Sequence, residues 1–547
     1  MDNNLLAEAL FPDTAETPDF YENLYPPRNL PEGAVVSRLA PSPTGFVHLG
    51  NIIQGLTSER MSHQSGGVLF LRIEDTDAKR EVKGGVRSII EGLSHYGIEF
   101  DEGAGTDGDF GLYGPYRQRQ RVKIYHCFAK QLVREGRAYP CFCTEEELGE
   151  IRQKQISAKE NIGYYGKWAV WRDKTNVEIS EKLSSGARWV LRFRSQGDSK
   201  NKIKFTDLIK GGVEVTENDI DHVILKSDGI PTYHFAHAVD DHLMRTTHVV
   251  RGDEWLPSLP FHIQLFNALG FKLPKYLHIG PLMKMDGTSK RKLSKRKDKE
   301  LALSFYREKG YPPESLYEYV LTVLNSNYED WRNANPSSAA GDFKFSYKKM
   351  NPAGSLFDEA KLNDVSKNVV AMFSAEKVYN DLLIWADEFD PDFGKVLRRE
   401  QQKAVLALAI GRGGKKPRKD FALWSEVKDK IGFVFDEYFS YTDKIEGFDK
   451  SDIIEVLRAF AKSYDSDDDR EKWFEKIKVI SEEAGFSPDI KEYKNNPSLF
   501  KGSVADVSSF IRVAVTGRLN SPDLYDIMKL LGKSATLRRI TNFEEVL

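Results

Sequence analysis

Three features are scarce in this chain of 547 residues: cysteine, long apolar runs and basic residues at the start. Its three cysteines are too few for a disulfide framework, and no apolar run approaches the roughly 18 residues that span a bilayer. Residues 1–33 are acidic, with Arg28 as their one basic side chain, whereas a secretory signal needs a basic start and an apolar stretch. We therefore expect a cytoplasmic protein that is not bound to a membrane.

The chain also has almost no net charge. Its 79 Lys and Arg residues stand against 82 Asp and Glu residues, which gives −3. This balance excludes a protein coated in positive charge, but it leaves room for nucleic acid bound on one face. With 40% hydrophobic residues, a chain of this length can bury several cores and predicts about three to five domains.

The first half of the chain alternates between strand and helix patterns. After an irregular arm at 1–33, residues 34–40 predict a strand, residues 51–64 a helix and residues 68–74 a second strand. This spacing is typical of a parallel βαβ unit. Residues 117–148 look mainly helical. Further strand-like runs lie at 189–194, 223–226 and 248–251, and the helical pattern prevails beyond about residue 300.

The tripeptide pattern His-x-Gly, which can open a phosphate-binding helix, occurs three times. His95 follows a helical pattern, and His278 is soon followed by Pro281, where no helix begins. Only His48 lies between a predicted strand and a predicted helix, at the edge where open α/β sheets bind ligands. We therefore single out His48 as the candidate nucleotide-binding residue.

A second candidate is a basic segment at residues 284–299. It holds eight Lys or Arg residues and two Asp residues, so it is locally very positive. Such a run is usually a solvated loop. Its Gly and Ser content and the sequence Lys292-Leu293-Ser294-Lys295-Arg296 instead favour a loop whose lysines follow migrating phosphate charge.

Five blocks of this sequence, in order, resemble the class I glutamyl-tRNA synthetase family. The blocks are Arg38–Gly45 with His48–Asn51, Arg72–Asp77, Asp228–His234 with Val239–His242, Val250–Leu256 and Lys292–Arg296. Two C-terminal segments, 512–518 and 530–533, resemble the anticodon-binding helices of the family. The resemblance implies an α/β fold: a Rossmann-like catalytic domain with an α+β insertion, followed by an all-α anticodon-binding half.

The resemblance also implies a two-step reaction and a set of site residues. ATP would activate glutamate as an adenylate, and the glutamyl group would then pass to tRNA, with Mg²⁺ accompanying ATP. The residues implied for ATP are His48, Gly50, Asn51, Glu254, Trp255, Leu293 and Lys295, with His48, Lys292 and Lys295 as the catalytic set. The residues implied for glutamate are Arg38, Ala40, Ser42, Glu74, Tyr233 and Arg251.

The chain departs from the family pattern at two places. His237 replaces a usual Asn, so we do not carry the substrate role of that Asn over to it. Some relatives hold zinc through a Cys-x-Cys pair and a later Tyr-x-x-x-Cys segment. Here Cys141 and Cys143 are present, but Trp168 occupies the position at which those relatives have the last cysteine. Because a structural zinc site needs four ligands, we expect no zinc, and no metal in the histidine-rich region at 222–248 either.

The resemblance further predicts the domain layout. We expect an N-terminal arm at 1–33, a catalytic domain at 34–116 and 223–280, an acceptor-end insertion at 117–222, a connecting region with the lysine loop at 281–375, and two helical anticodon-binding parts at 376–465 and 466–547.

Other functions stay open at this stage. The turn Glu74-Asp75-Thr76-Asp77 and the run 40–45 favour glutamate over the pattern of glutaminyl-tRNA synthetases. A short paralogue that modifies a tRNA base, or a small-acid nucleotidyltransferase without an RNA partner, would lack the helical half. The expected partner is tRNA for glutamate. The sequence leaves open whether tRNA for glutamine is also charged with glutamate. We expect the protein to be a monomer.

Overall fold

The chain divides into two compact units in a computed structural model that describes residues 2–43, 45–294 and 296–547. The first unit comprises residues 1–303 and 320–358, and the second comprises residues 304–319 and 359–547. In the described residues no helix is long and apolar enough to cross a membrane.

Among the described residues, the first unit holds β1–β14, α1–α9, α12, the first residue of α10 and the end of α11. Its elements up to residue 141 are α1 Asn3–Leu10, α2 Pro18–Leu24, β1 Val36–Leu39, α3 Leu49–Gln64, β2 Val68–Leu71, α4 Gly85–His95, β3 Glu102–Ala104, β4 Asp109–Phe110, α5 Val122–Arg134 and β5 Ala138–Cys141. The next are α6 Glu145–Ala158, α7 Asn176–Ser184, β6 Val190–Phe193, β7 Lys202–Asp207, β8 Gly211–Thr216, β9 Val223–Leu225, α8 Tyr233–Leu243, β10 His248–Gly252, α9 Leu259–Ala268 and β11 Lys275–Ile279. The last are β12 Leu282–Asp286, β13 Ser289–Lys292, α10 Leu303–Lys309, α11 Pro313–Leu324, α12 Tyr328–Ala334 and β14 Ser355–Leu356.

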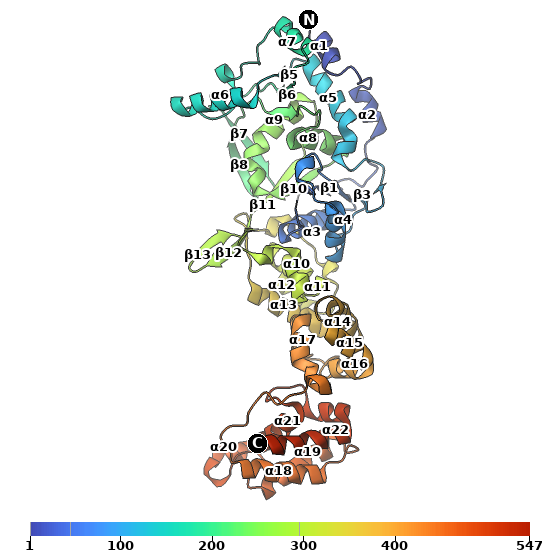
Figure 1. Cartoon of the computed structure of the whole chain (residues 1–547), viewed down its shortest axis with the longest axis vertical. Helices are drawn as coiled ribbons and strands as arrows, with labels where there is room; N and C mark the ends of the chain where they lie inside the picture. Colours follow the sequence, from blue (N-terminus) through green and yellow to red (C-terminus); the bar gives the residue numbers. More distant parts are fainter. Residues whose placement is uncertain (1, 44, 295) are drawn as a thin grey trace. The chain divides into compact units, whose positions relative to one another are not determined.

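A parallel sheet forms the centre of the first unit (Figure 1). Strands β1, β2 and β3 pair in parallel, and α3 connects β1 to β2, as the βαβ pattern predicts. Strands β10 and β11 form a second parallel pair beside β1, where the Thr247 amide donates to the Val36 carbonyl at 2.9 Å. Only glycine fits at residue 67, because a side chain there would lie 1.9 Å from the Val35 carbonyl oxygen. Because these strands run parallel, their carboxyl ends meet at one edge of the sheet.

The N-terminal segment is not the irregular arm that its composition predicts. Asp2 caps α1 by accepting a 2.9 Å hydrogen bond from the Leu5 amide, and the apolar face of α1 packs on α5. Lys130 of α5 donates to Glu8 at 2.7 Å. The prediction is wrong because α1 is stabilised by packing on α5, which the composition of residues 1–33 does not reveal.

The segment between residues 117 and 222 mixes helices with small antiparallel sheets. Strand β5 interrupts the long helical stretch expected there and pairs with β6, which pairs in turn with β9. Strands β7 and β8 form a two-stranded hairpin. Farther along the chain, β12 and β13 form another hairpin, which carries the basic segment.

The second unit is helical. It contains most of α10 and α11, followed by α13 Glu359–Met372, α14 Ala375–Phe389, α15 Pro391–Arg399, α16 Gln401–Ala409, α17 Trp424–Ile431, α18 Lys450–Ser463, α19 Arg470–Glu483, α20 Ile490–Asn495, α21 Val504–Thr516 and α22 Leu524–Val546. One apolar cluster joins α13–α19, α21 and α22, with Leu382, Phe435, Leu457 and Phe510 at most 1% exposed. The predicted fold class, α/β followed by a helical half, is confirmed. The six-part division of the domains stays a prediction.

Candidate active site

Two buried arginines lie at the carboxyl ends of neighbouring parallel strands. Arg38 of β1 and Arg251 of β10 are each 3% exposed. The Arg38 Nη1 donates to the Val250 carbonyl at 3.3 Å, so the two strands share this contact directly beside both arginines. A pair of guanidinium groups at the ligand-binding edge of a parallel sheet suits a substrate with carboxylate groups.

Asp241 of α8 joins Arg38 to a third arginine. The Arg38 Nε lies 3.2 Å from Asp241 Oδ2, and the Arg72 Nη1 lies 2.5 Å from Asp241 Oδ1. Burial opposes the charge of Asp241, but Arg72 and Arg38 outweigh it and hold the pKa of this carboxyl well below its usual value. Asp241 is therefore a fixed negative charge that orients both guanidinium groups.

The neighbouring Asp240 also pairs with Arg72, whose Nε lies 3.8 Å from Asp240 Oδ2, and it has three further partners. It accepts from Arg121 Nε at 2.6 Å, from Tyr125 OH at 2.8 Å and from Gln118 Nε2 at 3.0 Å. Sequence reasoning did not place Arg72, Arg121 or Asp240 near the site. All three residues are fully buried. The sequence signal that could have found them is a charged residue inside an otherwise apolar segment, because such residues are seldom buried without a partner.

Glu74 lies immediately beyond β2 and faces the same arginines. Its backbone amide donates to the Pro41 carbonyl at 3.0 Å, and its Oε1 accepts from Arg72 Nη2 at 3.3 Å. Burial is the largest influence on this carboxyl. It outweighs the attraction of Arg72 and Arg38 and raises the pKa of Glu74 to about 7. Of the other residues predicted for glutamate, Ala40 is half-buried and Ser42 is exposed in the turn after β1.

His237, the residue that departs from the family pattern, has both ring nitrogens engaged. Its Nδ1 lies 2.7 Å from Asp241 Oδ2, and its Nε2 lies 2.9 Å from Tyr276 OH. The ring is fully buried and stacks on Tyr233 with 5.7 Å between centroids. Burial lowers the pKa of His237 to about 3, so the ring is neutral. His237 thus lies between Asp241 and Tyr276.

His48 begins α3. Its backbone amide donates to Asn51 Oδ1 at 3.0 Å, which forms one half of a capping box. A side chain at residue 50 would lie 3.0 Å from the His48 ring, so Gly50 keeps this helix start open. The structure therefore brings His48, Gly50 and Asn51 together at a helix N-terminus, where backbone amides attract phosphate.

The lysine segment approaches the end of β10. The Lys292 Nζ lies 3.7 Å from Glu254 Oε2, and both side chains are more than half exposed. Glu254 and Trp255 belong to the short helix η4, Asp253–Ser258, and the Trp255 ring lies 4.3 Å from the Tyr233 ring. Leu293 is buried, and its amide donates to the Leu282 carbonyl at 2.9 Å. Lys295 lies outside the described residues.

The two cysteines of the Cys-x-Cys pair both contact one tyrosine. Cys141 Sγ and Cys143 Sγ each lie 3.5 Å from Tyr164 OH. Trp168 instead donates from Nε1 to Glu160 at 2.6 Å. Across residues 2–43, 45–294 and 296–547, no three His, Cys, Asp or Glu side chains are grouped so that they could hold a metal ion.

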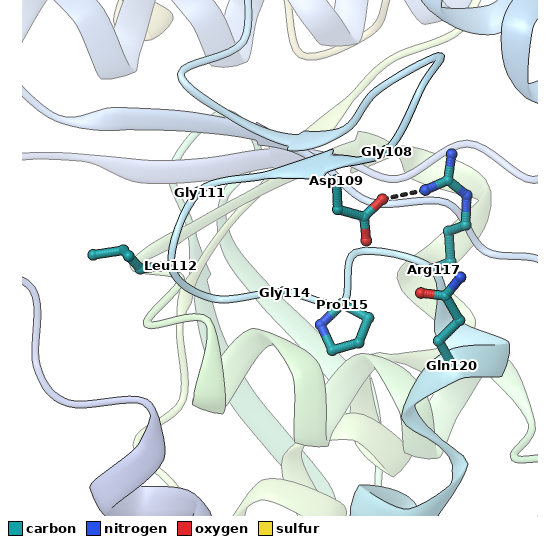
Figure 2. Close-up of a pocket in the computed structure, with 8 residues that line it drawn as sticks. All are labelled: Gly108, Asp109, Gly111, Leu112, Gly114, Pro115, Arg117 and Gln120. Carbon is teal, nitrogen blue, oxygen red and sulfur yellow. Dashed lines mark hydrogen bonds and ion pairs between the residues drawn. The ribbon is translucent and has the colours of Figure 1, made fainter.

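A cavity of about 440 Å³ lies beside β4, away from the residues predicted for the site (Figure 2). Asp109 and Arg117 form an ion pair on its wall, and the exposed Leu112 lines it with several glycines. Its walls contain none of the predicted site residues. The candidate site around Arg38 and Arg251 is therefore not part of this cavity.

Comparison with known proteins decides the family. Residues 34–350 match the catalytic domain of class I tRNA synthetases for E and Q, and residues 500–543 match an anticodon-binding domain. The chain belongs to the class I glutamyl/glutaminyl-tRNA synthetase family. Members of this family use ATP and have tRNA as a partner.

Two curated relatives and one solved structure extend this result. The chain is 49% identical over 542 residues to the glutamate–tRNA ligase of Acetivibrio thermocellus, with 99% of each chain covered. It is 46% identical over 544 residues to that of Clostridium perfringens, covering 98% of this chain and 99% of the relative. A crystal structure of a glutamate tRNA ligase from Elizabethkingia meningosepticum in complex with its amino acid aligns with a TM-score of 0.73, at 28% identity, over 94% of this chain and 99% of the other.

Proposed function

We propose that this chain attaches L-glutamate to the 3′-terminal adenosine of tRNA for glutamate in two ATP-dependent steps. The observation that carries the proposal is the pair of buried arginines, Arg38 and Arg251, on adjacent parallel strands. Its support from outside the site is the 49% identity to a glutamate–tRNA ligase over nearly the whole chain.

Glutamate carries two carboxylates and one ammonium group, and the pocket offers groups of the opposite charge. Arg38 and Arg251 would bind the carboxylates, and ionised Glu74 would attract the ammonium, with Tyr233 completing the wall. Arg38 and Arg72 share Asp241, which fixes their guanidinium groups before substrate arrives. Such fixed charges bind a charged substrate without reorganisation when it enters.

In the first step the α-carboxylate oxygen attacks the α-phosphorus of ATP, and pyrophosphate leaves. In the second, a ribose hydroxyl of the terminal adenosine attacks the activated carbonyl, and AMP leaves. Neither step needs a nucleophile from the protein, so alignment and charge stabilisation provide the catalysis. His48, Gly50 and Asn51 would hold ATP at the start of α3, with Glu254, Trp255 and Leu293 nearby. Lys292 and Lys295 would neutralise the phosphates.

The proposal includes three further points. Mg²⁺ would accompany ATP, held mainly by phosphate oxygens. Zinc would be absent, because Trp168 interacts with Glu160 and leaves only Cys141, Cys143 and Tyr164 together. The protein would be a monomer, and sedimentation of the purified chain would measure its oligomeric state. Metal analysis after dialysis should find well under one zinc per chain, and one firmly bound zinc would overturn the second point.

The experiment that tests the function is aminoacylation with purified tRNAs for glutamate and for glutamine, each with either amino acid. We expect glutamate to be charged on tRNA for glutamate. Glutamate charged equally well on both tRNAs would identify an enzyme that does not discriminate between them. Glutamine charged better than glutamate would overturn the substrate. ATP–pyrophosphate exchange with glutamate but no charging of either tRNA would favour a small-acid nucleotidyltransferase.

A further inference from the structure

The guanidinium group of Arg251 is held along two of its edges. Its Nε donates to His278 Nε2 at 2.9 Å, and its Nη1 donates to His262 Nδ1 at 3.1 Å. Its Nη2 is buried and has no hydrogen-bond partner in the part of the chain that the structure describes. Burying a charged donor without a partner is costly, so Nη2 marks the place where a ligand oxygen would be stabilised.

The contact on the Nε side continues to a buried carboxylate. Because an arginine only donates, His278 Nε2 must accept, and the proton of the neutral ring is on Nδ1. That Nδ1 donates to Asp207 Oδ2 at 2.7 Å. His278 is fully buried and Asp207 is 1% exposed. The hydrogen bonds are therefore donated in one direction, from the Arg251 guanidinium to the neutral His278 imidazole and from that ring to the Asp207 carboxylate.

Asp207 is itself firmly placed. Its Oδ1 accepts from the backbone amides of Ile209 at 2.9 Å and Lys210 at 2.8 Å, and its Oδ2 accepts from the His278 amide at 3.1 Å. Burial opposes ionisation, but the hydrogen bonds from His278 and these amides outweigh it and keep the pKa of Asp207 below its usual value. A permanent negative charge thus ends the chain of contacts.

The other side of Arg251 is equally constrained. His262 Nδ1 must accept from Arg251, so its Nε2 carries the proton and donates to His234 Nδ1 at 2.9 Å. The Tyr276 ring lies 4.5 Å from the guanidinium carbon. Burial holds the pKa of His262 well below its usual value, so this ring adds no competing charge. Arg251 is therefore fixed in position and orientation by neutral rings and one distant carboxylate.

We propose that Asp207 and His278 are positioning residues for glutamate binding: they close the Nε edge of Arg251 and leave Nη2 for a substrate carboxylate. This inference rests on the proposed function, because it takes Arg251 as a glutamate-binding residue. Asp207 ends β7, outside the parallel strands, whereas His278 lies on β11 opposite Arg251. The β7–β8 hairpin thereby supplies a carboxylate that acts on the amino-acid pocket through one imidazole.

The experiment compares the full-length protein with four variants by ATP–pyrophosphate exchange, at varied glutamate and at varied ATP. His278→Leu removes both hydrogen bonds, and His278→Gln keeps an acceptor for Arg251. Asp207→Asn removes only the charge. His95→Gln, at an exposed helix end, is the matched control. We expect His278→Leu to raise the KM for glutamate by about tenfold to hundredfold, with the KM for ATP changed by less than about twofold.

The remaining variants separate positioning from a general structural effect. His278→Gln should recover most of the loss, Asp207→Asn should show a smaller rise in the glutamate KM, and His95→Gln should behave like the parent. Equal rises in both KM values, or no recovery in His278→Gln, would overturn the inference. If the melting curve shows that His278→Leu does not fold, the glutamate KM values of Asp207→Asn and His278→Gln test the inference instead.

A double mutant distinguishes failure of this inference from failure of the proposed function. If His278 acts through Arg251, Arg251→Ala with His278→Leu should have the same glutamate KM as Arg251→Ala alone. Additive effects would overturn the positioning role. An Arg251→Ala variant with a normal glutamate KM would instead overturn the role of Arg251 in the proposed function.

Discussion

Arg72 and Asp241 form a fully buried ion pair, with 2.5 Å between Nη1 and Oδ1. The pair joins the end of β2 to α8, and Asp241 also receives Arg38 from β1. One carboxylate therefore determines how three elements meet at the predicted glutamate pocket. Removing one member of such a pair leaves buried charge without a partner, which is far more costly than losing an exposed pair.

The first prediction follows from this pair. Asp241→Asn should lower the stability of the protein by about 3–5 kcal/mol, because two guanidinium groups would lose their charged acceptor. A thermal melt of the full chain should show the loss, and the glutamate KM should rise in whatever protein stays folded. Glu91→Gln is the control, since its pair with Arg87 is exposed and 3.7 Å long. Equal melting temperatures for the two variants would contradict the prediction.

The second prediction concerns pH. Burial raises the pKa of Glu74 to about 7, so this carboxyl takes up a proton as the pH falls through 7. If ionised Glu74 attracts the ammonium of glutamate, the KM for glutamate should rise below pH 7, by up to about tenfold per pH unit. Exchange assays between pH 5.5 and 8.5 measure this. Glu74→Gln should have a high KM that no longer varies over this range; an unchanged profile would contradict the role.

The third prediction tests the lysine segment. Lys295→Ala should slow adenylate formation by roughly two or more orders of magnitude, because a positive charge near the transferring phosphate would be lost. The binding of tRNA should hardly change. Lys290→Ala is the control, since Lys290 is an exposed lysine of β13 in the same basic segment. Pre-steady-state adenylate formation measures the rate, and equal rates for the two variants would refute the role of Lys295.

The fourth prediction concerns the ion pair that closes this segment. Arg291 Nη1 and Nη2 each lie 2.7 Å from an oxygen of Asp298, which also accepts from the Ser294 amide at 2.8 Å. Arg291 lowers the pKa of Asp298 to about 2, so the pair is intact at neutral pH and is lost only as the pH falls through 2. Asp298→Asn should slow exchange by about tenfold without changing the glutamate KM.

A charge exchange provides the control for that variant. Arg291→Asp combined with Asp298→Arg should restore part of the rate, whereas Glu91→Gln, which removes an exposed pair outside this segment, should have little effect. Full activity in Asp298→Asn would show that the pair does not organise the segment.

Local patterns predicted much of the fold. The strand–turn–helix–strand order around His48 predicts a βαβ unit, and the structure contains it as β1, α3 and β2. His95 ends α4 as its context indicated. These features depend on neighbours within a few residues, where propensity and capping dominate. The N-terminal helices were missed because their stability depends on packing against α5, more than 100 residues away.

The site shows the same division. Arg38, Glu74 and Arg251 could be proposed from their motifs, and the structure places all three among buried charges. The pattern did not reveal that Arg38 pairs with Asp241, 203 residues away, or that Arg251 depends on His278 and Asp207. The sequence pattern does not single out His278, since no helix follows it.

The sequence by itself determined the family and the types of chemical group available, because those depend on short motifs in a fixed order. Only the tertiary structure decided which acid holds which arginine, since burial and distance, not residue type, select among the chain's many charges. The same reason applies to protonation. Burial makes His237 neutral and brings the pKa of Glu74 to about 7, and neither effect can be read from a residue and its neighbours in sequence.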